Sequence, residues 1–461
     1  MPPLLPAERC ALTAPFHPYL QPVPWFPMMR NQEGGLFSVA LSLRSPSPVV
    51  NRHRSSRGAR TFLHHTQKRT TATVRPSGLR TPALGVAPGQ GLCGAKAVLA
   101  AGGKNAHHTG MSDFSVPTSV SRPLSPNLPS RLLLGGIRWQ EQRKKKHADR
   151  SAARSEAEAA RSSDTQDAAH AEAQQHFLRA LRKAMDTPSF PQRLSSLPLR
   201  RVVSLQVPGA VGPLSARLYI PRGRVRGAVL YLHGGGFVHC GLNSHHGICC
   251  RLARASGAAV LLPDYRLAPE HPFPAAVEDC HATLSWLARA SARYWGGRVA
   301  VAGDSAGGNL AAVLAQDGKA GACPNPALQL LYYPSIYGRN DLPSQQTYAQ
   351  GYFLSRRSME WYAAQYIQRE EDWAHPRFVP GLADDLSGLA PAVIVTAECD
   401  PMRDEGQAYA QMLSKAGVPV QYRCYPGTLH AFLNFYAFMP HGKAALRFGG
   451  RALRKAFAAC P

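Results

Sequence analysis

The pentapeptide Gly303-Asp304-Ser305-Ala306-Gly307 constrains the fold of this chain more than any other feature of the sequence. The apolar run Val299–Ala302 precedes it and the small-residue run 308–315 follows it, which predicts a buried strand, a sharp turn and a helix packed on a sheet. The pattern G-x-S-x-G is typical of the turn that presents a nucleophilic serine. Glycines flank that serine because side chains there would collide with the strand and the helix. Ser305 is therefore a candidate nucleophile, and an ordinary strand-to-helix turn is the alternative.

Strand-like and helical runs alternate over the second half of the chain. The strand-like runs are Ser215–Ile220, Ala228–Leu232, Ala258–Leu262, Arg298–Ala302, Leu328–Tyr332, Ala392–Thr396 and Val420–Tyr425. The helical runs between them are His245–Ala255, Ala275–Arg293, Gly308–Gln316 and Arg403–Ala416. Such alternation predicts an α/β fold in which a mostly parallel sheet is flanked by helices on both faces.

An insertion of about sixty residues interrupts the alternation between Tyr332 and Ala392. It contains an aromatic helical run, Met359–Ile367, and a second helical stretch at about 156–185 precedes the first strand. Aromatic residues at helical spacing are more often core than ligand contacts. We nevertheless expect the segments 156–200 and 335–375 to form a small helical cap over the site.

The first third of the chain has a different composition. Residues 1–150 contain 21 Lys and Arg against 5 Asp and Glu, with many Pro, Ser and Gly and no apolar periodicity. Such a segment cannot bury enough apolar surface to offset the entropy of ordering it. We therefore expect residues 1–155 to be a disordered basic extension, or to follow from a start codon assigned too far upstream. The folded domain is expected over residues 156–461.

The composition also limits which partners and which cellular location we expect for this protein. No run reaches the roughly 18 apolar residues of a membrane-spanning helix, so no transmembrane segment is expected. The basic run Arg143–Lys146 could be a nuclear address or a nucleic-acid patch, but a solvated tail is the simpler reading, and no specific nucleic acid is expected. The ten cysteines show no C-x-x-C pair, which argues against a disulfide framework or a zinc site. We expect a cytoplasmic protein, with a homo-oligomer left open.

A nucleophilic serine needs a histidine as base, and the histidine needs an acid to orient it. Where the serine lies on this type of turn, the chain order is serine, acid, histidine. Asp400 follows the run Ala392–Thr396, and His430 follows Val420–Tyr425 through a short loop. Both therefore stand in the required order. The competing residues are Asp404 at a helix start, Glu398 at a strand end, and His271, His375 and His441 beside prolines.

The glycine run after His233 supplies a third element. His233-Gly234-Gly235-Gly236 directly follows an apolar strand. A bare backbone lets N–H groups approach the oxyanion of an acyl-transfer intermediate, and each such donor contributes roughly 3–4 kcal/mol. A phosphate-binding loop is the alternative, but the run lacks the Lys-Ser/Thr pair of a Walker motif. The N–H of Ala306, after the serine, would be a further donor.

With these motifs the chain resembles the hormone-sensitive-lipase-like branch of the α/β-hydrolases, bacterial carboxylesterases in particular. The resemblance covers about residues 160–455 and rests on five motifs, at 233–236, 264–270, 303–308, 400–406 and 427–430. It implies Ser305 as nucleophile, His430 as base and Asp400 as the orienting acid. It also implies the oxyanion donors Gly235, Gly236 and Ala306, supported by His233, Gly234 and Asp304. One departure is Ala431, where the family usually has glycine.

The resemblance implies a serine carboxylesterase that hydrolyses short-to-medium acyl esters through an acyl-enzyme, with no metal or organic cofactor. The expected partner is a small-molecule ester. An amidase or deacetylase with the same triad is one alternative. A non-catalytic small-molecule receptor, as the plant gibberellin receptors are on this scaffold, is another. Those receptors have lost the histidine, so the presence of His430 argues against that reading.

Overall fold

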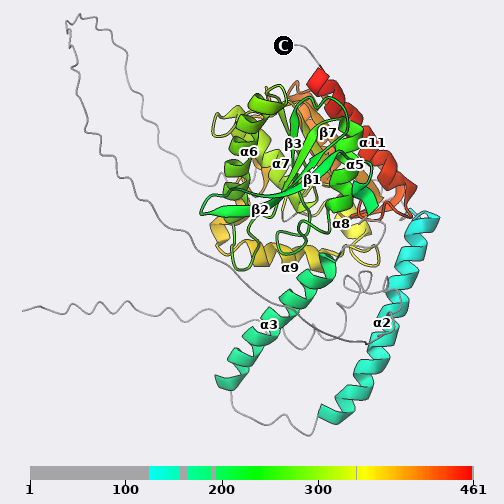
Figure 1. Cartoon of the computed structure of the whole chain (residues 1–461). Coiled ribbons are helices and arrows are strands. Elements are labelled where there is room, and N and C mark those ends of the chain that lie inside the picture. Colours follow the sequence, from blue (N-terminus) through cyan, green and yellow to red (C-terminus); the bar gives the residue numbers. More distant parts are fainter. Residues whose placement is uncertain (1–123, 156–163, 188–193, 339, 459–461) are drawn as a thin grey trace, which may run out of the picture. The chain divides into compact units, whose positions relative to one another are not determined.

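The computed structural model describes residues 124–155, 164–187, 194–338 and 340–458 (Figure 1). The expected extension therefore falls outside the described residues over 1–123.

Among the described residues, eight strands form a single sheet in the order β1-β2-β4-β3-β5-β6-β7-β8. Pairing is parallel from β4 through β8, whereas β1 and β2 pair antiparallel with each other and β2 pairs antiparallel with β4. The strands are β1 (Arg201–Pro208), β2 (Pro213–Ile220), β3 (Ala228–Leu232), β4 (Ala259–Pro263), β5 (Val299–Asp304), β6 (Gln329–Tyr332), β7 (Ala392–Cys399) and β8 (Val420–Leu429). The expected α/β architecture with a mostly parallel sheet is confirmed.

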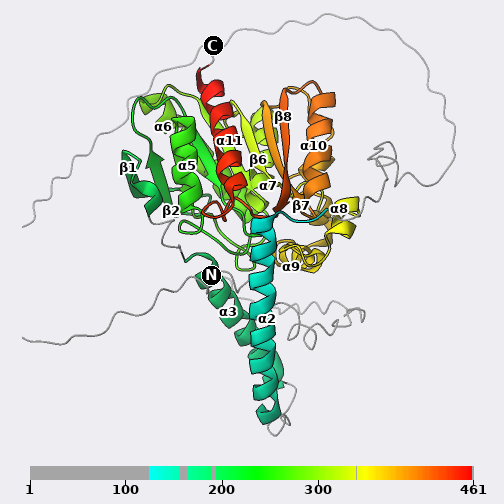
Figure 2. The ribbon, with the colours of Figure 1, turned by 90° about the vertical axis from the view of Figure 1, so that its right-hand side faces the viewer.

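Helices cover both faces of the sheet (Figure 2). On one face, α6 (Ala275–Tyr294), α7 (Ala306–Lys319) and α10 (Arg403–Lys415) enclose one apolar core. On the other face, α5 (His246–Ser256) and α11 (Pro440–Ala458) enclose a second core. Strands β3 and β4 are buried along their whole length, as strands with helices on both faces must be.

The largest differences from the sequence analysis are one additional strand and one longer strand. Strand β1 was not expected, because it is an edge strand with mostly exposed or half-buried side chains and therefore lacks a continuous apolar run. Strand β8 continues to Leu429, where a loop was expected after Tyr425. A register irregularity between Ala397 and Cys399 of β7 accompanies this longer pairing. The result places His430 directly at the end of a strand.

Helix α2 (Leu128–Ser155) lies within the segment 1–155, which was expected to be a disordered extension. The side chain of Asn127 accepts a hydrogen bond from the Ser130 amide at 3.1 Å, which caps the helix start. The Asn127 amide donates to the carbonyl of Gly427 at 2.9 Å, which joins this segment to β8. Apolar side chains of α2 are buried at Leu133, Leu134 and Ile137. This short apolar cluster is the signal that the composition of residues 1–150 concealed.

Helices α3 (Asp164–Met185) and α9 (Arg356–Tyr366) contact each other although about 170 residues separate them in the sequence. The rings of Phe177 and Trp361 meet edge to face with centroids 6.0 Å apart. Arg182, near the end of α3, donates to both carboxylate oxygens of Glu270 at 2.8 and 2.6 Å. The inserted segment also contains α8 (Pro343–Thr347) and the 3₁₀ helices η2 (Glu370–Ala374) and η3 (Pro380–Leu382). A further 3₁₀ helix, η1, spans Leu194–Ser196.

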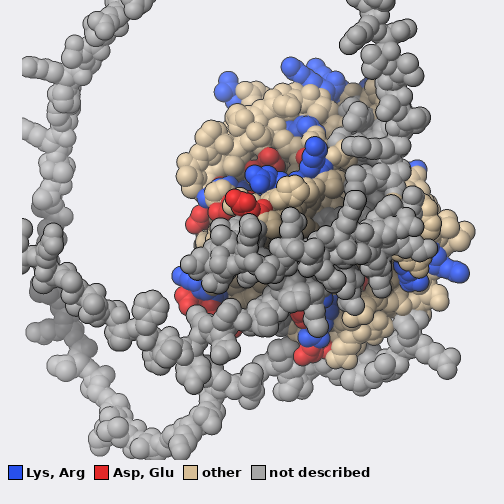
Figure 3. Space-filling view, turned by 90° about the horizontal axis from the view of Figure 1, so that it is seen from below, with Lys and Arg blue, Asp and Glu red and all other residues tan. Residues whose placement is uncertain are grey.

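No helix in the described ranges is long and apolar enough to cross a membrane. The cysteines in these ranges are all free thiols, at positions 240, 249, 250, 280, 323, 399 and 424. On the end of the molecule seen in Figure 3, acidic side chains lie beside basic ones over part of the surface that is not covered by grey atoms.

Candidate active site

Ser305 lies at the turn between β5 and α7, with φ 55° and ψ −120°. An L-residue occupies this positive-φ conformation at a cost of about 1–3 kcal/mol and only where its surroundings enforce it. Here the Ser305 amide donates to the Tyr332 carbonyl at 2.9 Å. A Cβ at Gly303 would overlap the Gly307 carbonyl, and one at Gly307 would overlap the Leu232 carbonyl. The two glycines therefore let the turn close against β3.

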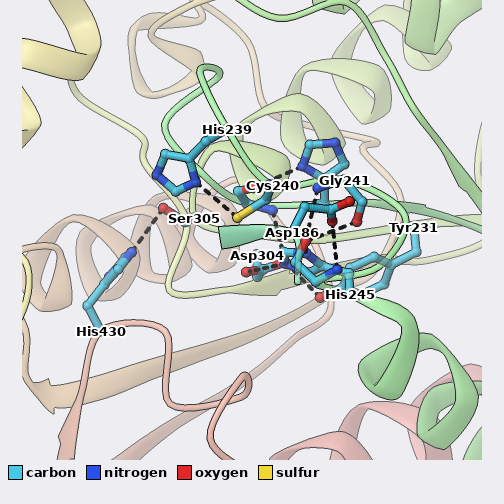
Figure 4. Close-up of polar contacts among 12 residues, drawn as sticks. Asp186, Tyr231, His239, Cys240, Gly241, His245, Asp304, Ser305 and His430 are labelled. Carbon is cyan, nitrogen blue, oxygen red and sulfur yellow. Dashed lines mark hydrogen bonds and ion pairs between the residues drawn. The ribbon is translucent and has the colours of Figure 1, made fainter. Parts of the chain in front are cut away.

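The structure brings Ser305, His430 and Asp400 into one hydrogen-bonded row. His430 Nε2 lies 2.9 Å from Ser305 Oγ, and His430 Nδ1 lies 2.7 Å from Asp400 Oδ2. Figure 4 draws the contact between His430 and Ser305. With the carboxylate accepting from Nδ1–H, Nε2 is free to accept the serine proton. The three residues follow the C-terminal ends of the parallel strands β5, β7 and β8, which is where such sheets place their ligand sites.

Asp400 is fully buried, and its second oxygen, Oδ1, accepts the Met402 amide at 2.8 Å. This bond fixes the carboxylate plane toward the imidazole. The ring of Tyr333 meets that of His430 edge to face at 4.9 Å and fixes the ring from its other side. Ala431 has φ 61°, a conformation that costs a non-glycine residue about 1–2 kcal/mol. This torsion accounts for the family's usual glycine after the histidine.

None of the competing residues contacts Ser305 in the described structure. Glu398 accepts the Gly427 amide at 2.7 Å. His375 accepts the Arg377 amide at 3.1 Å, and His441 lies 3.5 Å from the Asn127 amide nitrogen.

Asp404 also points away from His430. Its Oδ2 accepts the Ser344 amide at 2.8 Å, and its Oδ1 accepts from Arg403 at 2.7 Å. The next residue, Glu405, is fully buried and accepts the amides of Ile336 and Tyr337 at 2.8 and 3.0 Å. The two acids after Asp400 therefore hold the start of the inserted segment, a role that the sequence analysis missed.

The glycine run after β3 lies beside the serine turn. Gly235 and Gly236 have φ 123° and 61°, which only glycine adopts without strain. A Cβ at Gly235 would overlap the carbonyl of His239. In the described part of the chain, the amides of Gly235, Gly236 and Ala306 donate to no other group. Three free N–H groups near one hydroxyl can receive a developing negative charge.

His233 shapes the beginning of this loop. Its Nδ1 donates to the Gly234 carbonyl at 2.9 Å, and its ring stacks on that of Tyr265 with centroids 4.3 Å apart. The Tyr265 hydroxyl donates to the His233 carbonyl at 2.7 Å. Complete burial lowers the pKa of His233 to about 4, with a further contribution from His245. The ring is thus neutral at neutral pH and acts as a rigid support.

Asp304, which precedes the serine, joins the turn to the glycine loop. It is buried and accepts hydrogen bonds from the Gly234 amide at 3.2 Å and the Tyr231 hydroxyl at 2.8 Å. His245 Nε2 lies 3.1 Å from its Oδ1. Burial alone would raise the pKa of Asp304, but the attraction and hydrogen bonding of His245 outweigh it and leave the pKa below its ordinary value. Asp304 is therefore charged and shared by both halves of the site.

The network extends from Asp304 to helix α3 (Figure 4). His245 Nδ1 lies 3.0 Å from the Ser244 hydroxyl, and the Ser244 amide donates to Asp186 at 2.8 Å. Asp186 also accepts the amide and side-chain amide of Asn243, both at 3.0 Å. Its position just after α3 links that helix to the serine turn. His245 and Asp186 lie far from Asp304 in the sequence, so no motif predicted this chain of contacts.

Tyr362 connects helix α9 to the same loop. Its ring lies where a Cβ on Gly236 would be, and its hydroxyl is 2.8 Å from His239 Nε2. Burial lowers the pKa of His239 to about 3, with smaller effects from His233 and His245, so this ring is also neutral. The sequence analysis counted Tyr362 among the core residues of an aromatic helix. The structure instead places it directly against an expected oxyanion glycine.

No group of three or more His, Cys, Asp and Glu side chains suited to a metal ion occurs among the described residues.

Comparison with known proteins agrees with this architecture. A family model described as an alpha/beta hydrolase fold matches residues 229–434. The esterase LipI of Mycobacterium tuberculosis is 39% identical over 281 residues, which cover 57% of this chain and 86% of that protein. The carboxylic ester hydrolase LipN of the same organism is 42% identical over 244 residues, 51% of this chain and 65% of LipN. The crystal structure of an esterase from Pyrobaculum calidifontis superimposes with a TM-score of 0.57 at 39% identity, over 61% of this chain and 94% of that one.

Proposed function

Because this chain belongs to the hormone-sensitive-lipase-like branch of the α/β-hydrolases and is a hydrolase, we propose that it is a serine carboxylesterase with the triad Ser305, His430 and Asp400. The relatives named as esterases support ester hydrolysis as the reaction class. The single observation that carries the proposal is the unbroken row of contacts from the Ser305 hydroxyl through both His430 nitrogens to the buried Asp400 carboxylate.

In the first half of the reaction, Ser305 Oγ attacks the ester carbonyl while His430 Nε2 accepts the hydroxyl proton. Asp400 stabilises the imidazolium that forms. The imidazolium then gives its proton to the departing alkoxide, so a neutral alcohol leaves and the acyl group stays on Ser305. In the second half, His430 takes a proton from water, hydroxide attacks the acyl-enzyme, and the proton returns to Ser305 Oγ as the carboxylic acid is released.

Both halves pass through a tetrahedral oxyanion. The free amides of Gly235, Gly236 and Ala306 would receive it, because they lie beside the nucleophile and compete with no other acceptor among the described residues. Their backbone is held in place before substrate arrives, through Asp304 on Gly234 and through Tyr265 on His233. Donors fixed in advance need no reorganisation as the charge develops, which is the main source of their catalytic effect.

We assign substrate selection to helices α3 and α9, acting as the cap. Tyr362 supports this assignment, since its ring contacts Gly236 and its hydroxyl contacts His239. An acyl group bound next to the oxyanion donors must pass this ring. Short-to-medium acyl chains are therefore the proposed substrates.

A substrate series tests the proposal. Initial rates are measured on p-nitrophenyl acetate, butyrate, octanoate and palmitate, and on the p-nitroanilide of the best acyl group. We expect the highest kcat/KM for butyrate or octanoate, and a value at least about 1,000-fold lower for the anilide, equivalent to about 4 kcal/mol in the barrier. A preference for the anilide would indicate an amidase, and a preference for palmitate would contradict the assigned role of the cap. If the protein hydrolyses none of these compounds, the carboxylesterase proposal is wrong.

The Asp304 network gives a second prediction. Asp304→Asn keeps the shape of the side chain but removes the charge that faces His245, so the Gly234 amide and the serine turn lose their common anchor. We expect kcat to fall about 10- to 100-fold with little change in KM, because small displacements of positioned groups cost rate rather than ground-state binding. The readout is the separate determination of kcat and KM on the best ester.

Asp317→Asn is the matched control for this variant. Asp317 also pairs with a histidine, His281, at 2.6 Å, but it lies near the far end of α7 and touches neither the glycine loop nor the turn. Its kcat should stay near that of the parent protein. Equal losses of kcat in the two variants would mean that Asp304 contributes only to general stability.

A further inference from the structure

A cationic cleft lies at the opposite end of the sheet from Ser305. It occupies about 840 Å³ and is lined by five arginines, Arg200, Arg201, Arg224, Arg226 and Arg298. Its base lies at the starts of β3 and β5. There the Gly227 amide donates to the Trp295 carbonyl, and the Ala228 amide donates to the Arg298 carbonyl. The catalytic residues follow the other ends of the parallel strands. The cleft is therefore a site distinct from the one described above.

Among the described residues, no carboxylate offsets the charge of these arginines. The chain has no Asp or Glu in the stretches 187–263, 280–303 and 406–461, and every residue that lines the cleft comes from one of these three stretches. Within the described ranges, no carboxylate forms an ion pair with any of the five guanidinium groups. Arg298 donates to the Ala456 carbonyl, which is neutral. On the end of the molecule seen in Figure 3, by contrast, acidic side chains lie beside several of the basic ones.

Five like charges around one cavity repel one another, and a bound anion removes that repulsion. Guanidinium groups match phosphate oxygens in paired, charge-assisted hydrogen bonds. A single phosphate can engage only part of this set, so two or more linked phosphates fit the charge better. The volume lies within the range of about 300–1,000 Å³ that is typical of small-ligand sites.

Aromatic side chains form another part of the wall. Tyr294 is 62% exposed, Trp295 is half-buried, and the ring of Phe457 lies against Gly227. Exposed rings beside arginines offer flat apolar surface to a planar organic group. We propose that this cleft binds an organic polyphosphate, a small molecule that carries two or more linked phosphates on a planar group.

Helix α11 provides a control for this proposal. Lys443, Arg447 and Arg451 repeat every four residues along its exposed side, and they belong to the same acid-free stretch without lining the cleft. They contribute to the positive field but not to the cavity. Charge reversal at these positions therefore separates a general electrostatic attraction from binding in the cleft.

Isothermal titration calorimetry on the full chain tests the proposal with ATP, pyrophosphate, adenosine and phosphatidylglycerol vesicles as probes. We expect ATP and pyrophosphate to bind, ATP more tightly, and adenosine not to bind. The double variant Arg224→Glu/Arg226→Glu should lose at least about 100-fold in affinity, because each reversed contact to a phosphate costs about tenfold or more. The double variant Arg447→Glu/Arg451→Glu, with the same change in net charge, should stay within about threefold of the parent.

Folding and ester hydrolysis serve as internal checks, since neither arginine pair touches the catalytic residues. The thermal midpoint and the rate on the best ester should remain those of the parent in both double variants. Equal loss of ATP affinity in the two variants would overturn the proposal, as would binding to vesicles without binding to pyrophosphate. Absence of binding to both ATP and pyrophosphate at low ionic strength would overturn it as well. None of these results depends on the esterase activity.

Discussion

Ser305→Ala is expected to yield a folded protein whose kcat for ester hydrolysis is lower by about 10⁶-fold. The substitution removes the nucleophile and leaves the oxyanion amides and the substrate contacts in place, so a small residual rate over water should persist. The measurement is steady-state turnover of the best p-nitrophenyl ester at high enzyme concentration, with circular dichroism to verify the fold. Near-parent turnover in this variant would show that Ser305 is not the nucleophile.

His430→Ala should lose activity by a similar factor, and the double variant should lose no more than either single one. Members of a triad act as one unit, so their effects do not add. A double variant much slower than both single variants would mean that the two residues act in separate steps. Covalent labelling by a fluorophosphonate gives an independent readout, because it should require both Ser305 and His430.

Asp400→Asn is expected to lower kcat by about 10⁴-fold while the fold persists. The asparagine is the same size and can still accept the Met402 amide. It removes the charge that stabilises the imidazolium and favours the wrong tautomer, in which Nδ1 accepts from the asparagine amide and Nε2 carries the proton, so Nε2 cannot accept the proton of Ser305. The pH dependence of kcat and the rate at the plateau measure the loss.

Asp404→Asn is the matched control, four residues further along the chain. Asp404 is also buried, but its carboxylate holds the Ser344 amide and Arg403 rather than the imidazole. This variant should lose stability and retain most of its kcat. The reverse ranking of the two variants would transfer the role of the orienting acid to Asp404.

Local patterns along the chain were sufficient to predict most of the sheet. Strand β3 is an uninterrupted apolar run and was expected with the bounds that the structure has. Strand β1 escaped prediction because half-exposed edge strands carry mixed side chains. Helix α2 was not expected because its buried side chains, Leu133, Leu134 and Ile137, lie in a basic segment whose average composition indicates disorder. The average composition of 150 residues does not reveal a cluster of three buried apolar side chains.

In the site, too, local motifs predicted some residues, whereas other contacts depend on the tertiary structure. Ser305, Asp400 and His430 each follow a strand within a short motif, so the chain order predicted their meeting, and the structure places them within hydrogen-bonding distance. The contacts of Asp304 with His245, and of Ser244 with Asp186, depend on the positions that loops from separate segments take in the folded protein. The spacing of residues along one sequence does not predict these loop positions. The aromatic helix gave no sign that Tyr362 would face Gly236, because periodicity specifies which side of a helix is apolar and not what lies opposite.

The contact between α3 and α9 has a consequence for how this scaffold can be altered. Phe177 and Trp361 belong to segments encoded far apart, yet each ring forms part of the other's surroundings. A library that randomises one helix alone will mostly sample mismatched pairs, and its members will report damage to packing rather than new selectivity. Libraries that vary both helices together, or exchange both between relatives as a matched set, keep the pair compatible. The sheet and the serine turn can then be inherited unchanged, as a separate module, while acyl preference is reselected above them.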